Sequence, residues 1–327
     1  MSDESCFTNG YLDTKIDWIP GLEGIRLRDF LAFIRTTDPN AIMLHYNIEQ
    51  LKNAPRAKAI LLNTFEDLEE KDLKISKEIT PSIGSTTTPS GDDDEDDELL
   101  VSLIGSSLWK EDHECLKWLD KKEPKSVVYV NFGSVAVMSQ EQLSELAWGL
   151  ANSGHYFLWI IRPDLVSNAP TVLPKEFILE TEERGMLTNW CDQEQVLSHP
   201  SVAVFLTHSG WNSTIESIVE GVPMICFPLF AEQQTNCKFV CGDWANGIEI
   251  ESDVRRNVVE RKVREMMEGE KGKVLREKAL EWREKARVQS SLVSVKTFMV
   301  YMYDDGQALP KNSSNWMHEN YSDRRMD

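Results

Sequence analysis

Residues 190–233 read WCDQEQVLSHPSVAVFLTHSGWNSTIESIVEGVPMICFPLFAEQ, and this stretch decides the fold. Two apolar runs lie within it, Val202–Thr207 and Met224–Phe227, and each has the length of a buried strand. A segment with helical character follows each run, Asn212–Glu220 after the first and Ala231–Asn246 after the second. Strands that alternate with helices predict an α/β fold with a parallel, doubly wound sheet.

The same alternation extends in both directions from this stretch. We expect a strand over Val127–Phe132, a helix over Glu141–Asn152, a strand over Phe157–Ile161, and two helices over 254–287 that are broken near Gly269 or Gly272. In a doubly wound sheet, ligands bind beyond the carboxyl ends of the strands. Ser134 and His208 fall at such ends and are candidate site residues.

Changes in composition divide the chain into four parts. Residues 1–82 are mixed α/β, with a buried strand expected over Ala59–Phe65, and residues 83–106 are a linker rich in Ser, Thr, Gly and acidic residues. Residues 107–289 hold the alternating strands and helices, whereas residues 290–327 lack periodicity and are expected to be disordered.

The unbroken acidic run Asp92–Glu98 lies inside the linker. Its Asp-x-Asp pattern could be taken for a metal site that holds a nucleotide-sugar. The surrounding Ser, Thr and Gly residues and the lack of apolar framing favour a solvated linker instead.

Composition excludes several function classes. The chain has 327 residues, enough for two domains, and a formal net charge of -19, which argues against a nucleic-acid partner. No apolar run approaches the length of a membrane span, and the polar first residues do not resemble a signal or transit peptide. The six cysteines are scattered without a metal-type spacing, which indicates reduced thiols in a cytoplasmic protein. The oligomeric state stays open.

The turn Thr207–Ser213, THSGWNS, joins an expected strand to an expected helix. The first backbone N–H groups of such a helix lack intrahelical partners, so the turn favours an anion, and Gly210 permits close approach. Asn212 and Ser213 add side-chain donors, and His208 can donate to a phosphate oxygen as charge builds on a departing diphosphate. The alternative for His208 is a histidine whose hydrogen bonds are satisfied at a strand end.

Four further positions carry polar or aromatic chemistry, each with an ordinary alternative. Trp190 precedes polar residues and could present its ring to a base, although most tryptophans belong to a core. Glu216 lies one helical turn after Asn212 and could accept from ribose hydroxyls, or be a solvated helix residue. Glu232 and Gln233 suit sugar hydroxyls, but an acid and an amide can also begin a helix.

Residues 190–233 resemble the signature box of plant UDP-dependent glycosyltransferases, inverting enzymes of the GT-B fold. The similarity continues through residues 9–14 (NGYLDT), 34–39 (IRTTDP), 130–134 (VNFGS) and 265–273 (EMMEGEKGK). These segments resemble the subgroup that glucosylates cyanohydrins, cytokinins and iridoid aglycones such as 7-deoxyloganetin. The resemblance implies a Rossmann-like C-terminal domain that binds a UDP-sugar and an incomplete Rossmann-like N-terminal domain on the acceptor side.

The resemblance also assigns a role to each matching residue. It implies that Trp190 stacks on uracil beside the Cys191 backbone and that Gln193 and Glu216 bind the ribose. The diphosphate would be held by His208, Asn212, Ser213 and Ser134. The sugar would be contacted by Trp211, Glu232 and Gln233. The closing Gln of the box implies UDP-glucose as the donor. The acceptor would be a hydroxyl of a small-molecule aglycone, and the family requires no metal or other cofactor.

The catalytic base of the family has no counterpart in this sequence. The family's His lies in the first strand-to-helix loop of the N-terminal domain and is oriented by an Asp further along, whereas residues 1–82 resemble only the later part of that domain. His45 and His113 lie outside any matching motif, so no catalytic residue is assigned. We therefore expect an N-terminally truncated chain with a divergent C-terminal tail.

Substitutions inside the box are modest. Asp192, Ser209 and Glu232 stand where the family usually has Pro, Cys and Asp. The sequence thus predicts a UDP-glucose-dependent glucosyltransferase. The alternative is a catalytically inactive UDP-sugar-binding fragment or pseudoenzyme that lacks the catalytic His.

Overall fold

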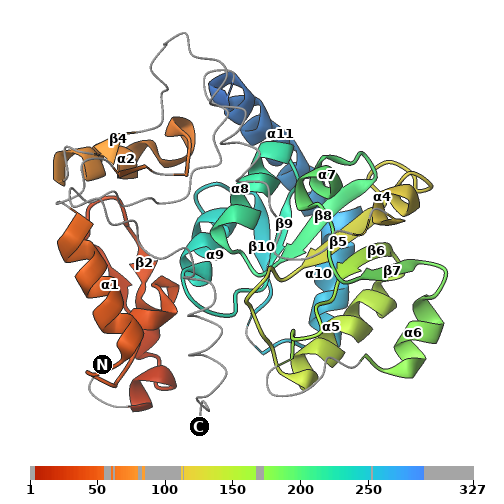
Figure 1. The fold of residues 1–327 in the computed structure, drawn as a ribbon, viewed down its shortest axis with the longest axis horizontal. Coiled ribbons are helices and arrows are strands. Elements are labelled where there is room, and N and C mark those ends of the chain that lie inside the picture. Colours follow the sequence, from red (N-terminus) through yellow and green to blue (C-terminus); the bar gives the residue numbers. More distant parts are fainter. Residues whose placement is uncertain are drawn as a thin grey trace.

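A computed structural model describes residues 4–54, 60, 61, 63–79, 83, 84, 112, 114–166, 173–251 and 253–290. Its largest feature is a six-stranded parallel sheet in the order β10-β9-β8-β5-β6-β7 (Figure 1). The strands are β5 (Val127–Asn131), β6 (Tyr156–Ile160), β7 (Gly185–Thr188), β8 (Val202–Thr207), β9 (Met224–Cys226) and β10 (Gly247–Glu249). The strand order reverses between β5 and β8, so ligands of such a sheet bind beyond their carboxyl ends.

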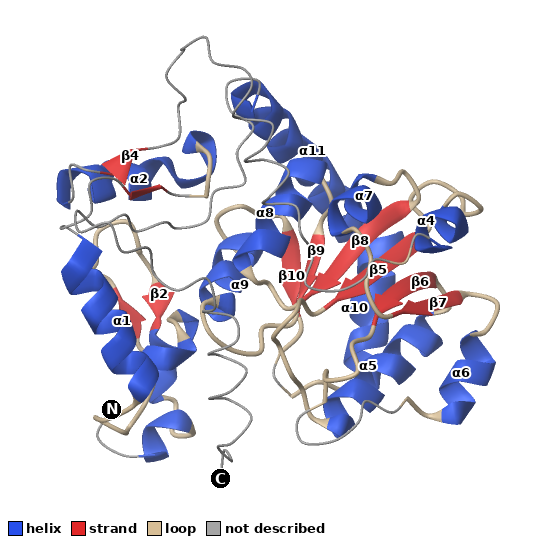
Figure 2. Cartoon of the chain, viewed as in Figure 1, coloured by secondary structure: helices blue, strands red, loops and turns tan. Residues whose placement is uncertain are grey.

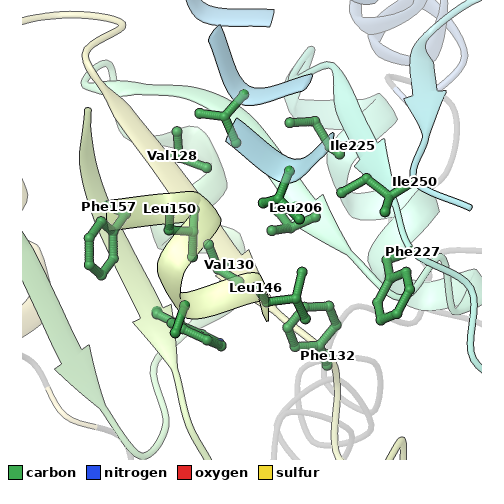
Figure 3. Packing of buried hydrophobic residues seen from close by; sticks show 14 of the residues in the cluster. Val128, Val130, Phe132, Leu146, Leu150, Phe157, Leu206, Ile225, Phe227 and Ile250 are labelled. Atoms are coloured by element: carbon green, nitrogen blue, oxygen red, sulfur yellow. The ribbon is translucent and has the colours of Figure 1, made fainter. Parts of the chain in front are cut away.

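Helices cover both faces of this sheet, which explains why its strands are apolar on both sides. Val128 and Val130 belong to a buried cluster with residues of α5 and α10 (Figure 3), whereas Val127 and Tyr129 join a second cluster on the opposite face. The helices are α4 (Glu114–Leu119), α5 (Gln140–Ser153), α6 (Lys175–Thr181), α7 (Gln193–Ser198), α8 (Trp211–Glu220), α9 (Gln233–Cys241), α10 (Arg256–Glu268) and α11 (Glu270–Ser290).

The N-terminal residues form small elements beside this sheet (Figure 2). They are η1 (Glu4–Phe7), η2 (Tyr11–Asp13), β1 (Lys15–Ile16), β2 (Ile25–Arg26), η3 (Leu27–Asp29), η4 (Ala32–Ile34), α1 (Ile42–Asn53), β3 (Ile60–Leu61), α2 (Glu66–Ile79) and β4 (Ile83–Gly84). β1 and β2 pair antiparallel, whereas β3 and β4 pair parallel. Phe33 meets Phe230 edge to face, and Leu68 is buried in the second cluster, so these elements pack on the large sheet's domain.

The expected α/β, doubly wound fold is confirmed, with differences at the ends of elements. The helix expected over Ala231–Asn246 was too long: Ala231 has a φ of 57° and Gly242 has non-helical angles, so α9 spans Gln233–Cys241. The strand expected over Ala59–Phe65 is described only as the two residues of β3. The break between the last two helices falls at Gly269, as expected.

Some expectations concern residues outside the described ranges. They include the acidic run Asp92–Glu98, the tail beyond Ser290, and His113. Within the described ranges, no helix combines the length and the apolar character that crossing a membrane requires.

Candidate functional site

The turn Thr207–Ser213 lies where β8 ends and α8 begins, at the carboxyl edge of the sheet. Ser209 adopts a left-handed φ of 64°, and its N–H donates to Thr207 Oγ1 at 3.2 Å. Gly210 is the N-cap of α8, and its carbonyl accepts from the Thr214 N–H at 3.0 Å. The N–H groups that precede Thr214 lie ahead of the helical hydrogen-bond pattern, so this end of α8 presents backbone donors to an anion.

The imidazole of His208 lies between two glycines. A Cβ atom added to Gly133 would lie 2.7 Å from His208 Cε1 and Nε2, and one added to Gly210 would also overlap the ring. Gly133 has a φ of 69°, a left-handed angle that favours glycine. The two glycines therefore give the ring the space to lie against the backbone of both loops.

His208 is neutral in this environment. Burial and, after it, the positive charge of Arg162 lower its pKa to about 4. A neutral imidazole donates from one nitrogen only. Nδ1 is buried without a hydrogen-bond partner, whereas a hydrogen bond between the ring and the Asn131 backbone partly opposes the lowering of the pKa.

A hydrogen-bond network links β5, α7 and α8 beside the turn. Asn131 Nδ2 donates to Gln193 Oε1 at 2.8 Å and to Tyr129 Oη at 2.9 Å. Gln193 Nε2 in turn donates to Ser213 Oγ at 2.9 Å and to Glu216 Oε2 at 2.7 Å. The amide of Gln193 is thus fixed in orientation, and it holds the Glu216 carboxylate next to the start of α8.

Cys191 is buried next to this network. Its side chain is buried, and its Sγ is 3.4 Å from Tyr129 Oη. The hydrogen bond with Cys115 and then burial raise the pKa of Cys191. The backbone of Cys191, rather than a reactive thiolate, is therefore the group that a ligand could use.

Arg162 supports the loop that carries Ser134. The residue follows β6 and is 2 % exposed, and its Nη1 donates to the Ser134 carbonyl at 2.7 Å and to Asp164 Oδ1 at 2.9 Å. Nη2 donates to the Ala136 carbonyl. Arg162 thus fixes the backbone on either side of Val135, directly after β5.

Glu232 and Gln233, the last two residues of the 190–233 segment, form hydrogen bonds with the local backbone. Glu232 is the N-cap of α9 and its Oε1 accepts from the Trp211 N–H at 3.3 Å. Gln233 is buried, and its Oε1 accepts from the N–H groups of Leu229 and Phe230 at 2.9 and 3.1 Å. Because these bonds fix the amide oxygen, the NH2 group of Gln233 points away from that loop.

The two tryptophans of the box are both partly buried. Trp190 follows β7, packs against the second core cluster, and accepts through its carbonyl from the Asp112 N–H at 3.0 Å. Trp211 Nε1 donates to the Asn63 carbonyl at 2.7 Å. The ring N–H of Trp211 is therefore already bonded to the N-terminal part of the chain.

The N-terminal segment reaches the turn at several points. Asn63 Nδ2 donates to Asn212 Oδ1 at 3.4 Å, and Thr235 Oγ1 donates to the Asp29 carbonyl at 2.7 Å. The Ala32 N–H donates to the carbonyl of Ala231 at 2.7 Å. These contacts place residues 29–32 and Asn63 next to the starts of α8 and α9.

The structure brings most of the expected site residues to one edge of the sheet and adds others. Ser134, Gln193, His208, Asn212, Ser213, Glu216, Glu232 and Gln233 lie on or beside the turn and its two neighbouring loops. The sequence analysis missed Asn131, Arg162 and Asn63. Asn131 is the last residue of β5, and Arg162 lies two residues after the end of β6. Their positions at the carboxyl ends of strands were the signal that could have identified them.

Comparison with known proteins gives consistent results. The family model "UDP-glucoronosyl and UDP-glucosyl transferase" matches residues 110–281. UDP-glycosyltransferase 85A8 of Stevia rebaudiana is 55% identical over 294 residues, covering 89% of this chain and 61% of that protein. The 7-deoxyloganetin glucosyltransferase of Catharanthus roseus is 53% identical over 291 residues, covering 89% and 60% respectively.

A solved structure of a plant glycosyltransferase agrees with the family match. Phytolacca americana UGT2, complexed with UDP-2fluoro-glucose and pterostilbene, matches with a TM-score of 0.70 and 34% identity, covering 85% of this chain and 60% of that one. The chain belongs to the plant UDP-glycosyltransferases of the GT-B fold, in the subgroup of UDP-glycosyltransferase 85A8 and 7-deoxyloganetin glucosyltransferase. It spans about three fifths of the length of the curated relatives it matches.

Proposed function

We propose that this chain binds UDP-glucose beyond the carboxyl ends of β5 and β8. We further propose that it is the donor half of an inverting glucosyltransferase acting on a hydroxyl of a small-molecule aglycone. The observation that carries the proposal is the start of α8, where the Asn212 and Ser213 N–H groups precede the helical hydrogen-bond pattern, beside a neutral His208 and a pre-oriented Glu216. The names of the relatives, a 7-deoxyloganetin glucosyltransferase among them, support the choice of reaction.

The nucleoside part of the donor has two sets of candidate contacts. Trp190 would stack on uracil, with the Cys191 backbone at the base edge, because the indole is only half-buried and directly precedes Cys191, whose Sγ contacts Tyr129 of the network. Glu216 would accept hydrogen bonds from the ribose hydroxyls, and Gln193 would hold it in place through the 2.7 Å bond. A carboxylate that is already oriented loses little freedom on binding.

The diphosphate would lie at the start of α8, within reach of Ser134, Asn212, Ser213 and His208. These groups and the helix N-terminus offer neutral donors, which suit the charge that grows on UDP as the bond to the sugar breaks. Trp211, Glu232 and the NH2 group of Gln233 would contact the sugar. Glu232 is one methylene longer than the usual Asp, which would shift its hydrogen bonds to the sugar hydroxyls.

The transfer step also requires a base. The acceptor hydroxyl must lose its proton as it attacks the anomeric carbon and UDP departs. Of the histidines that the structure describes, His208 alone belongs to the turn, and His45 lies on α1 with its Nε2 2.7 Å from the Pro39 carbonyl. This observation favours a second candidate function, in which the chain binds the UDP-sugar without turning it over.

Calorimetric titration with UDP tests donor binding. Glu216→Gln should weaken UDP binding by about tenfold or more, because a charge-assisted hydrogen bond is worth about 1.5–3 kcal/mol. Glu220→Gln is the matched control, because it changes another acid of α8 one turn further on, which faces Arg283 at 3.9 Å. Wild-type protein that fails to bind UDP would contradict the proposal.

Release of UDP from UDP-glucose, measured with a panel of hydroxylated small molecules, separates the two candidates. Turnover that is lost in His208→Ala but unchanged in His45→Ala supports the glucosyltransferase. UDP binding without any release supports the binding protein.

The division into domains and the cellular location belong to the same proposal. Residues 1–82 would be the acceptor-side part, 83–106 the linker and 107–289 the donor domain. The six free cysteines agree with a cytoplasmic location, where thiols stay reduced.

A further inference from the structure

Three cysteines that are apart in the sequence converge beside the turn Thr207–Ser213. Cys226 ends β9, whereas Cys237 and Cys241 lie four residues apart on α9 and so share one face of that helix. The three Sγ atoms all lie within 4.8 Å of one another. In the part of the chain that the structure describes, no other three His, Cys, Asp or Glu side chains bring ligand atoms this close together.

The spacing of these sulfur atoms fits a tetrahedral metal ion. Zinc binds thiolate sulfur at about 2.3 Å, so two sulfurs of a tetrahedral site lie roughly 3.8 Å apart. Cys237 Sγ and Cys241 Sγ are already 3.9 Å apart. Closing the remaining sulfur pairs from at most 4.8 Å requires only side-chain rotation or a small shift of α9 against β9.

The surroundings of the cluster also suit a bound cation. Cys226 and Cys237 are 0 % and 1 % exposed, whereas Cys241 is only partly buried and offers a route of entry. Glu249 pairs with Cys226 in the parallel register of β9 and β10, so its side chain leaves the same face of the sheet. Its oxygens do not belong to the group of atoms within 4.8 Å of one another, so a change of rotamer would be needed for this carboxylate to complete the coordination.

We propose that Cys226, Cys237 and Cys241 form a binding site for one thiophilic divalent d10 cation of the Zn2+ type. On binding, three S–H bonds break and three metal–sulfur bonds form, the three protons pass to solvent, and no electron is transferred. Water or Glu249 occupies the fourth position. Soft thiolate ligands select such a cation over Mg2+ or Ca2+, which prefer oxygen.

A metal ion at this position would join β9 to α9 close to the turn. Asn236, one residue before Cys237, donates through Nδ2 to the Ser209 carbonyl at 2.9 Å. The three cysteines are not among the residues proposed to contact the UDP-sugar. The site is therefore structural, and it stands whether or not the proposed function holds.

Titration of the reduced full chain with Cd2+ tests the site, because thiolate–cadmium bonds give an ultraviolet charge-transfer band that carboxylates do not give. We expect a band that saturates at one equivalent per chain and that Zn2+ displaces. Cys237→Ser and Cys241→Ser should each lower the Cd2+ affinity by more than about tenfold and weaken the band. Cys115→Ser, which removes a buried thiol that pairs with Cys191 instead, should leave both unchanged.

Several results would overturn the proposal. One is a band of wild-type intensity and affinity in both cluster variants, and another is a band that depends on Cys115. A third is a disulfide between two of the three cysteines in the isolated chain together with no Cd2+ uptake after its reduction. Circular dichroism checks the folding of each variant, and Cys241→Ser, at the partly exposed position, preserves the test if Cys237→Ser does not fold.

Discussion

The buried neutral state of His208 predicts a specific loss of stability in acid. The pKa of this residue falls from 6.5 to about 4 on folding, so between these values the unfolded chain binds a proton that the folded chain does not. The free energy of unfolding therefore decreases as the pH falls through this window. Going from about pH 7.5 to about pH 4.5 should remove about 2.5 kcal/mol through His208 alone.

Urea unfolding at the two pH values measures this contribution by comparing the wild type with His208→Gln. Other groups titrate in both proteins, so the variant should lose about 2.5 kcal/mol less on acidification than the wild type does. Equal losses in the wild type and His208→Gln would refute the reasoning, because His208 would then titrate alike in the folded and unfolded chains.

Three further substitutions probe the same edge of the sheet. Gly133→Ala should destabilise by about 1–3 kcal/mol more than Gly154→Ala in chemical denaturation, since both glycines have left-handed φ but only at Gly133 would the Cβ meet the His208 ring. Trp211→Phe should cost about 1 kcal/mol and raise hydrogen exchange over residues 63–68, because it removes the bond to the Asn63 carbonyl. Arg162→Met should cost about 3 kcal/mol and weaken UDP binding in calorimetry, whereas the exposed Arg256→Met should leave UDP binding unchanged.

The sequence predicted the strongly apolar strands of the fold and missed the weakly apolar strands β7 and β10. β8 was placed correctly because six apolar or β-branched residues follow one another in Val202–Thr207. β7 begins with Gly185, and β10 has only three residues, Gly247–Glu249, so neither carries a periodic signal. Their pairing with β6 and β9, rather than their own composition, makes them strands.

The position of the turn could be predicted, but its side-chain network could not. A strand, a glycine and a helix start are local features of residues 202–220. The bond from Asn131 to Gln193, by contrast, joins residues that are 62 positions apart, and no spacing in the sequence indicates it. The low pKa of His208 is equally non-local, because it depends on burial and on the charge of Arg162.

The electrostatics of the turn suit the proposed binding of a diphosphate by a chain with a net charge of -19. Arg162 is buried behind the turn, and its Nη groups are bonded to carbonyls and to Asp164, so its charge acts through space rather than by contact. In a poorly solvated interior that charge adds to the effect of burial in keeping His208 neutral, and it makes the potential at the start of α8 more positive. The groups that would touch the diphosphate are then fixed dipoles. Fixed dipoles need not reorganise as charge grows on departing UDP, and unlike a contacting cation they do not hold the released product tightly.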